Sequence, residues 1–145
     1  MIKVKEIKSK KEILQFVKFP FSLYKDCKYW VPPLTNDELE TLDKVNNPVF
    51  KNAEATYYLA FKNKKIVGRI AVIINHIEVK EQKKNKVRFG WLDMIDDIEV
   101  TKTLLQKVID IGIRTILENR LADFKGKAKE AFSDLDKNPI WLNKE

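Results

Sequence analysis

The chain has 145 residues, of which 44% are hydrophobic and 34% are charged, a balance typical of one globular domain and not of a disordered segment. A single cysteine excludes an internal disulfide framework, and one cysteine with one histidine cannot make a structural zinc site. The formal charge of +7 would suit nucleic acid, an anionic surface or a phosphorylated cofactor, and it equally suits a lysine-rich solvated surface.

The N-terminal segment MIKVKEIKSKKE alternates charged residues with single apolar ones, so it lacks the apolar core of a signal peptide. No apolar run in the sequence is long enough to span a bilayer. Together with the low cysteine count, these features predict a cytoplasmic protein with no membrane partner.

The chain begins with a predicted strand and a short amphipathic helix. Residues 2–7 alternate apolar and charged side chains, which is the period of a half-buried strand. Ser9 followed three residues later by Glu12 forms a capping-box pattern at the start of a helix. We expect this helix to stop at Pro20, because proline removes a hydrogen bond from a helix interior.

Residues 24–34, YKDCKYWVPPL, connect this helix to a second one, whose start carries the capping pattern of Thr35 and Glu38. The two prolines of the segment are expected to make a rigid connection to the second helix. Tyr29 and Trp30 are interpreted as packing residues, because clustered aromatic side chains usually cover a core. Contact with a substrate is the alternative.

The middle of the chain predicts a β-hairpin, a third strand and a helix. Residues 56–62 and 66–75 are rich in β-branched and aromatic side chains and are separated by a polar break. Gly68 would allow a bulge or the close approach of another backbone. Residues 87–95 predict a strand, and residues 100–118 repeat apolar side chains at helical spacing. The side chains expected to be buried are those of Leu59, Ile70, Val72, Leu104 and Val108.

The predicted element order is therefore β-α-α-β-β-β-α, an α/β (α+β) fold with a mainly antiparallel sheet and flanking helices. After Glu118 the apolar pattern fades, and residues 119–145 are expected to be a frayed helix and an irregular, divergent tail. Residues 1–118 are predicted to form the structured part of the chain.

This element order resembles the first half of the GNAT-type acyl-CoA N-acyltransferase fold. The amino-acid sequence itself is more closely similar to the N-terminal part of one GNAT-like family of uncharacterised bacterial proteins. The resemblance covers about residues 19–117 and rests on YKDCKYWVPPLTNDELETLDKVNNPVF, LAFKNKKIVGRIAVIINH and RFGWLDMIDDIEV. Members of that family are longer, so the chain is expected to be truncated or altered near Asn119, without the strands that complete the sheet.

The resemblance implies acyl transfer from acetyl-CoA or another acyl-CoA to a small-molecule amine, without a metal. In such folds a helix follows the hairpin and the next strand, here residues 87–95, and the start of that helix binds the cofactor pyrophosphate. Typical members have a glycine-rich turn after a basic residue there, whereas this sequence has three carboxylates, which suit helix capping and would repel phosphate. We therefore expect acetyl-CoA to bind weakly or not at all. The residues at the cofactor position are Met94, Ile95, Asp96, Asp97, Ile98, Glu99 and Val100.

Asp93 is the candidate general base, because it lies on the strand that resembles the one that often carries the GNAT base. The alternation of Trp91, Asp93 and Ile95 places it on one face with two large apolar side chains. The alternative is a carboxylate at the sheet edge paired with a lysine. His76, at the end of the hairpin, is a second candidate base, with an incidental loop histidine as the alternative, and Arg69 could be an outward strand residue. The candidate substrate-binding residues are Tyr29, Trp30, Arg69 and His76.

Three functions stay open at this point. The first is a GNAT-like acyltransferase domain, or a truncated and inactive relative of one. The second is a non-enzymatic basic module that binds RNA or an acidic protein, although lysine-rich residues 83–86 lack the interleaved aromatics that nucleic-acid binding favours. The third is an assembly fragment that self-associates through an exposed sheet edge.

Overall fold

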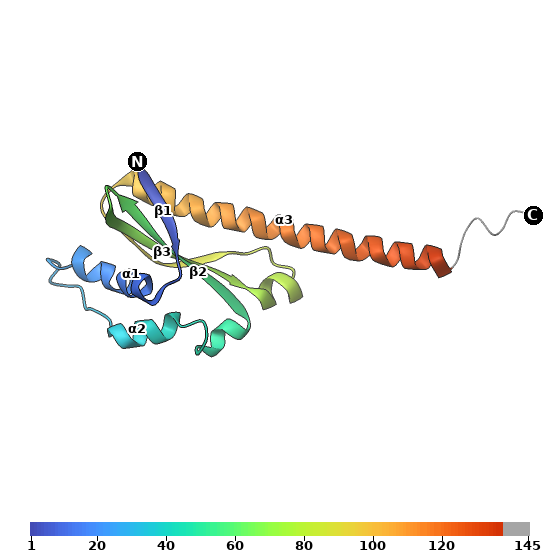
Figure 1. Ribbon diagram of the computed structural model, residues 1–145, viewed down its shortest axis with the longest axis horizontal. Coiled ribbons are helices and arrows are strands. Elements are labelled where there is room, and N and C mark those ends of the chain that lie inside the picture. Colours follow the sequence, from blue (N-terminus) through green and yellow to red (C-terminus); the bar gives the residue numbers. More distant parts are fainter. Residues whose placement is uncertain (138–145) are drawn as a thin grey trace, which may run out of the picture. The chain divides into compact units, whose positions relative to one another are not determined.

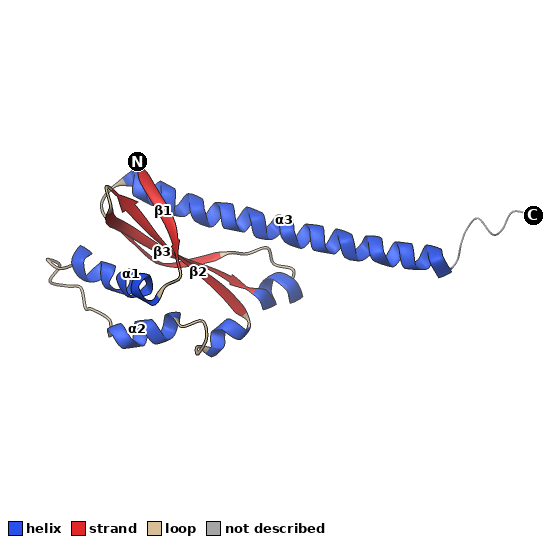
Figure 2. Cartoon of the chain, in the orientation of Figure 1, coloured by secondary structure: helices blue, strands red, loops and turns tan. Residues whose placement is uncertain are grey.

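The computed structural model describes residues 1–137 and contains one four-stranded antiparallel sheet with flanking helices (Figure 1). The strands, in spatial order, are β1 (Ile2–Ile7), β2 (Ala53–Lys62), β3 (Lys65–Asn75) and β4 (Arg88–Met94). The helices are α1 (Lys10–Leu23), α2 (Thr35–Leu42) and α3 (Ile98–Lys137), with short helical turns at Pro48–Lys51 and Ile77–Glu81 (Figure 2). The predicted fold class and element order are confirmed.

The chain divides into two compact units, Met1–Gly112 and the residues from Ile113 onward. The described part of the second unit is the continuation of α3. Of the frayed helix and irregular tail expected after Glu118, the helix is present and continues through residues 119–137. This stretch is rich in alanine and lysine, which favour helix, and its large apolar side chains Leu121, Phe124 and Phe132 are exposed. Residues 138–145 lie outside the described part, and a domain boundary at residue 118 stays a prediction.

The predicted hairpin is formed by β2 and β3, and β4 pairs antiparallel with β3 in the same sheet. The turn between β2 and β3 consists of Asn63 and Lys64, with φ angles of 50° and 65°. Two successive positive φ angles are typical of the mirror-image turns whose twist matches that of the flanking strands. The five side chains that were expected to be buried are all buried.

One face of the sheet is covered by the first turns of α3. Val100, Leu104 and Val108 of this helix pack in one apolar cluster with side chains such as Ile70 of β3. A Cβ atom on Gly68 would come within 2.9 Å of the Leu104 side chain, so the glycine permits this close packing. The strand register also shifts beside it, as predicted for a glycine inside a strand.

The other face is covered by α1 and α2 and has its own apolar cluster, which includes Ile7, Phe16, Leu42, Tyr57 and Leu59. The predicted capping box at the start of α1 is confirmed, because the Ser9 and Glu12 side chains each accept the other residue's backbone N–H. The capping pattern predicted for α2 is wrong. Its N-cap is Leu34, which makes no side-chain cap, and the Glu38 carboxylate accepts instead from the Trp91 indole N–H at 2.8 Å.

The expected end of α1 at Pro20 is also wrong, since the helix continues to Leu23. Proline at this position leaves the carbonyl of Phe16, four residues earlier, without its helical donor. The Arg69 guanidinium of β3 donates to that carbonyl from Nη1 at 2.8 Å. A donor from another element therefore satisfies the acceptor that the proline leaves free, and the last turn of the helix is retained.

Candidate functional site

Asp93 lies on β4 at the centre of a hydrogen-bonded group formed with β3 and the end of α1. It pairs with Arg69 in the strand register, and Arg69 Nε donates to Asp93 Oδ2 at 2.8 Å. The Tyr24 hydroxyl donates to Asp93 Oδ1, also at 2.8 Å. Both carboxylate oxygens thus have a donor, one of them cationic. We call these three residues the Tyr24–Asp93–Arg69 cluster.

Arg69 is buried, with only 6% of its surface exposed, so its interpretation as an outward strand residue is wrong. Besides Asp93 it contacts α1, through the Phe16 carbonyl and through the Phe16 ring, whose centroid lies 5.0 Å from the guanidinium carbon. A buried charge is tolerated when it is paired and hydrogen-bonded in this way. Arg69 joins β3, β4 and α1, and its role in binding a substrate stays a prediction.

The expected alternation around Asp93 is correct for Trp91 and wrong for Ile95. Trp91 packs on the cluster under α1 and α2, whereas Ile95 packs on the cluster under α3. A register shift between β3 and β4 and the positive φ of Trp91, 48°, mark a bulge at this point. The alternative interpretation named a lysine as partner of Asp93, and the observed partners are an arginine and a tyrosine.

The contact with Asp93 also affects Tyr24. The hydrogen bond to the carboxylate, followed by burial, raises the pKa of the Tyr24 hydroxyl above its ordinary value of 10.0. Tyr24 therefore remains a proton donor at neutral pH.

The start of α3 is capped by Asp97. Its Oδ1 accepts from the Glu99 backbone N–H at 3.0 Å, and its Oδ2 accepts from Lys62 Nζ at 2.8 Å. The Asp97 carbonyl accepts from the backbone N–H groups of Val100 and Thr101. The Lys62 contact, followed by the Glu99 N–H, lowers the pKa of Asp97, which keeps the cap ionised. The predicted carboxylate cap is confirmed for Asp97.

The remaining residues at the cofactor position divide into core and surface. Val100 is fully buried, and Met94 and Ile95 pack on the same apolar cluster. Asp96, Ile98 and Glu99 are exposed, and Glu99 pairs with Lys102 instead of capping the helix. Asp96, Asp97 and Glu99 are the three carboxylates at the predicted cofactor position, and binding of a cofactor by this segment stays a prediction.

The other candidate residues lie at different distances from this cluster. Tyr29 is 81% exposed, so its interpretation as a packing residue is wrong. Trp30 is half-buried and packs edge-on against Phe21 and against the Tyr24 ring, which places it next to the cluster. His76 follows the end of β3, where its Nε2 lies 3.9 Å from a carboxylate oxygen of Glu54. The structure thus brings Arg69 to Asp93 and Trp30 to Tyr24, whereas Tyr29 and His76 make no hydrogen bond or ion pair with Asp93.

Two contacts of this region were missed at the sequence level. The Tyr24 hydroxyl was not predicted to reach Asp93, and Glu38 was assigned to a helix cap although it binds Trp91. Residues 1–137 contain no group of three or more His, Cys, Asp or Glu side chains that could hold a metal ion. No helix in the described part of the chain combines the length and the apolar character needed to cross a membrane.

The chain is similar to two proteins of known name. It is 34% identical over 101 residues to protein YghO of Escherichia coli, a match that covers 70% of this chain and 26% of YghO. It is 27% identical over 105 residues to bacterial ceramide synthase of Caulobacter vibrioides, covering 72% of this chain and 27% of that protein. The chain thus spans about a quarter of the length of these relatives. No family model and no solved structure matches it.

Proposed function

We propose that the chain is a GNAT-like N-acyltransferase-type domain that transfers an acyl group from an acyl-CoA to a small-molecule amine, and that by itself it binds the acyl-CoA weakly. The similarity to a protein named bacterial ceramide synthase is the observation that carries this proposal. The antiparallel sheet β2-β3-β4 followed directly by α3 fits the first half of such a fold.

The Tyr24–Asp93–Arg69 cluster suggests how acid and base roles would be divided. Arg69 holds the Asp93 carboxylate in place, and Asp93 in turn orients the Tyr24 hydroxyl. When the amine nitrogen bonds to the thioester carbonyl carbon and the carbon–sulfur bond breaks, the Tyr24 oxygen would accept the proton that the amine loses, and the hydroxyl proton would pass to Asp93. The CoA thiolate would leave and take its proton from water. Asp93 is the first residue to mutate.

Weak binding of the cofactor follows from the start of α3. The backbone N–H groups of Glu99, Val100 and Thr101 already have acceptors in Asp97. Asp96 and Glu99 add negative charge, and two like charges a few ångströms apart cost about 1–4 kcal/mol near a protein surface. The overall charge of +7 opposes this effect only diffusely, because salt screens charges beyond about 8–10 Å.

The test is calorimetric titration of the purified chain with acetyl-CoA, beside the double variant Asp96→Asn/Glu99→Gln. This variant keeps the Asp97 cap and removes two exposed carboxylates. We expect no saturable micromolar binding by the unmodified chain and about ten-fold tighter binding by the variant. Asp26→Asn/Glu40→Gln, which removes two exposed carboxylates elsewhere, serves as the control.

Two outcomes would contradict the proposal. If the two double variants bind acetyl-CoA equally poorly, α3 is not a cofactor site and the acyltransferase function fails. Saturable micromolar binding by the unmodified chain, lost on mutating residues 94–100, would contradict the weak binding alone. Saturable binding of a non-specific RNA in a parallel titration would favour the basic nucleic-acid module instead.

A further inference from the structure

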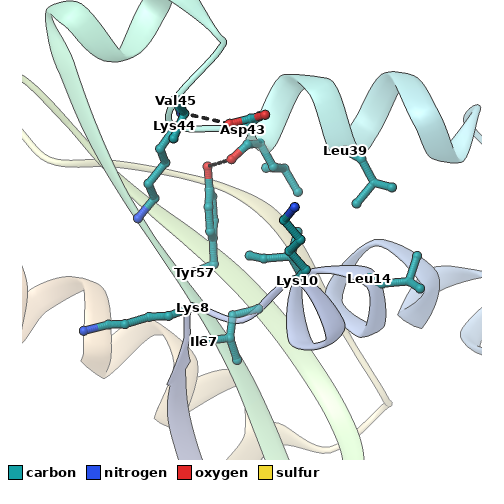
Figure 3. Close-up of a pocket in the computed structure, with 11 residues that line it drawn as sticks. Ile7, Lys8, Lys10, Leu14, Leu39, Asp43, Lys44, Val45 and Tyr57 are labelled. Carbon is teal, nitrogen blue, oxygen red and sulfur yellow. Dashed lines mark hydrogen bonds between the residues drawn. The ribbon is translucent and has the colours of Figure 1, made fainter.

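A cavity of about 730 Å³ lies between α1 and α2, with β1 and β2 beneath it (Figure 3). Its apolar lining includes Ile7, Ile13, Leu14, Leu39, Leu42 and Tyr57. The volume is within the range of small-molecule sites, which are mostly apolar with a few placed polar groups. Neither the Tyr24–Asp93–Arg69 cluster nor the start of α3 lines it, so the cavity is separate from the site proposed above.

Three lysines contribute to the same cavity, Lys8, Lys10 and Lys44. Lys8 is paired with Glu6 at 3.1 Å, whereas neither Lys10 nor Lys44 has a carboxylate within 4.0 Å among residues 1–137. The Lys44 ammonium lies 5.0 Å from the centre of the Tyr57 ring, and Figure 3 shows Lys10 and Lys44 on opposite sides of that ring. Two cationic groups without ion-pair partners thus border an apolar cavity.

Asp43 is the one carboxylate of the lining, and it is engaged within its own turn. It accepts from the Val45 backbone N–H at 2.8 Å and from the Asn46 side chain at 2.7 Å. These contacts, the Asn46 side chain first, lower the pKa of Asp43 and keep it fixed at the end of α2. The charge of Lys10 contributes to this lowering, but neither the Lys10 nor the Lys44 ammonium group lies within 4.0 Å of the Asp43 carboxylate.

We propose that this cavity binds a fatty acid, with its hydrocarbon chain on the apolar lining and its carboxylate at Lys10, while Lys44 on the other side of the Tyr57 ring adds to the positive charge. Burial of the chain removes apolar surface from water, and a charge-assisted hydrogen bond from the Lys10 ammonium holds the carboxylate. A neutral alcohol of equal length has no charge for the lysines, and a cationic amphiphile is repelled by them. The cavity therefore distinguishes amphiphiles by the sign of the head group.

In the first experiment, the chain is titrated with dodecanoate below the critical micelle concentration, and binding is measured by calorimetry. We expect saturable binding of one molecule per chain, with affinity falling roughly four-fold for each methylene removed from the ligand. Dodecanol should bind at least ten-fold more weakly, and dodecyltrimethylammonium should not bind. Equal affinity for dodecanoate and dodecanol, or no binding of dodecanoate by the folded chain, would overturn the proposal.

The second experiment uses variants of the lining. Lys10→Gln/Lys44→Gln should weaken dodecanoate binding at least ten-fold, whereas Lys51→Gln/Lys65→Gln, an equal charge loss at exposed lysines outside the lining, should leave it unchanged. Leu14→Glu, at the partly exposed wall of the cavity, should abolish binding while circular dichroism shows an unchanged fold. If the two lysine double variants lose the same affinity for dodecanoate, the attraction is due to diffuse charge, and the proposed fatty-acid site is overturned.

The acyltransferase proposal and this one can fail separately. The titration with acetyl-CoA depends on the start of α3, and the titration with dodecanoate depends on the cavity between α1 and α2. A chain that binds dodecanoate but gains no acetyl-CoA affinity in Asp96→Asn/Glu99→Gln would retain the fatty-acid site without the transferase function.

Discussion

The side chains that α3 packs on one face of the sheet are apolar, whereas the face under α1 and α2 combines an apolar cluster with buried polar contacts. Val100, Leu104 and Val108 make the first contact layer. On the other face Arg69 is buried against Asp93, and the Tyr57 hydroxyl donates to the Leu42 carbonyl at 3.1 Å. Burial of Tyr57 raises the pKa of its hydroxyl to about 12, so it remains a donor.

This difference indicates which face of the sheet holds the candidate catalytic and binding residues. Apolar packing is non-directional and tolerates exchange of side chains of similar volume, whereas each buried polar group needs a particular partner. The candidate catalytic residues and the cavity with its two lysines both lie on the α1 and α2 face. The α3 face stabilises the sheet on which the other face is organised.

The largest expected effect is that of Arg69→Ala. It leaves Asp93 without its cation and the Phe16 carbonyl without its donor, and breaking a buried ion pair from one side typically costs about 3–5 kcal/mol. Chemical denaturation measures the free energy of unfolding. Arg88→Ala, which removes an exposed arginine paired with Glu78, should cost less than about 1 kcal/mol. Equal costs for the two variants would erase the distinction between the faces.

On the apolar face, Gly68→Ala should lower the free energy of unfolding by about 1–3 kcal/mol through overpacking. The added methyl would lie 2.9 Å from Leu104 and 3.0 Å from Val100, whose buried side chains have little room to move. The double variant Gly68→Ala/Leu104→Ala removes the nearest of these contacts, so the two costs should not add. Strict additivity in denaturation measurements would contradict this account of the packing.

Trp30→Ala should have a smaller effect, about 1–2 kcal/mol, because the indole is half-buried and its loss removes two aromatic contacts, with Phe21 and Tyr24. A fully buried tryptophan would cost about 3–5 kcal/mol. Tyr29→Ala, at an exposed ring, should change stability by less than about 0.5 kcal/mol. A larger effect of Tyr29→Ala than of Trp30→Ala, in the same thermal unfolding series, would reverse this assignment.

The smallest expected effect depends on pH and lies at the start of α1. The Lys5 ammonium, followed by the Ser9 side chain, lowers the pKa of Glu12 from 4.5 to about 2 in the folded chain. Because the pKa of Glu12 is lower in the folded chain than in the unfolded one, its ionised form stabilises the fold when the pH is above the unfolded-state pKa. This contribution is lost as the pH falls from about 4.5 to 2. The difference in Tm between the unmodified chain and Glu12→Gln should shrink over this interval. A difference that stays constant would exclude the ionised cap.

Local patterns were sufficient for the sheet and for most helix starts. The β-branched run around the Asn63–Lys64 turn predicted the hairpin, because strand propensity and turn geometry are properties of neighbouring residues. The Ser9–Glu12 box likewise depends on residues three apart. The same pattern at Thr35 and Glu38 failed because the Trp91 indole, distant in sequence, takes the carboxylate.

The candidate site was only partly predictable for the same physical reason. Asp93 and Arg69 could be named from their strands, but their contact depends on the register between β3 and β4 and on the bulge at Trp91. The Tyr24 contact joins residues 69 positions apart, which no local period reveals. The cavity depends on how α1 and α2 pack over the sheet, and its lining residues are spread from Ile7 to Tyr57 along the chain.

The contact between Arg69 and the Phe16 carbonyl has a consequence for the order of folding. It joins residues 53 positions apart, and contacts of such separation form only after the entropy of closing the intervening chain has been lost. The first turns of α1 need only their own capping box, whereas the last turn beyond Pro20 lacks a donor until β3 is in place. We therefore expect α1 to form in two stages, its C-terminal turn and Tyr24 becoming ordered only when the sheet assembles.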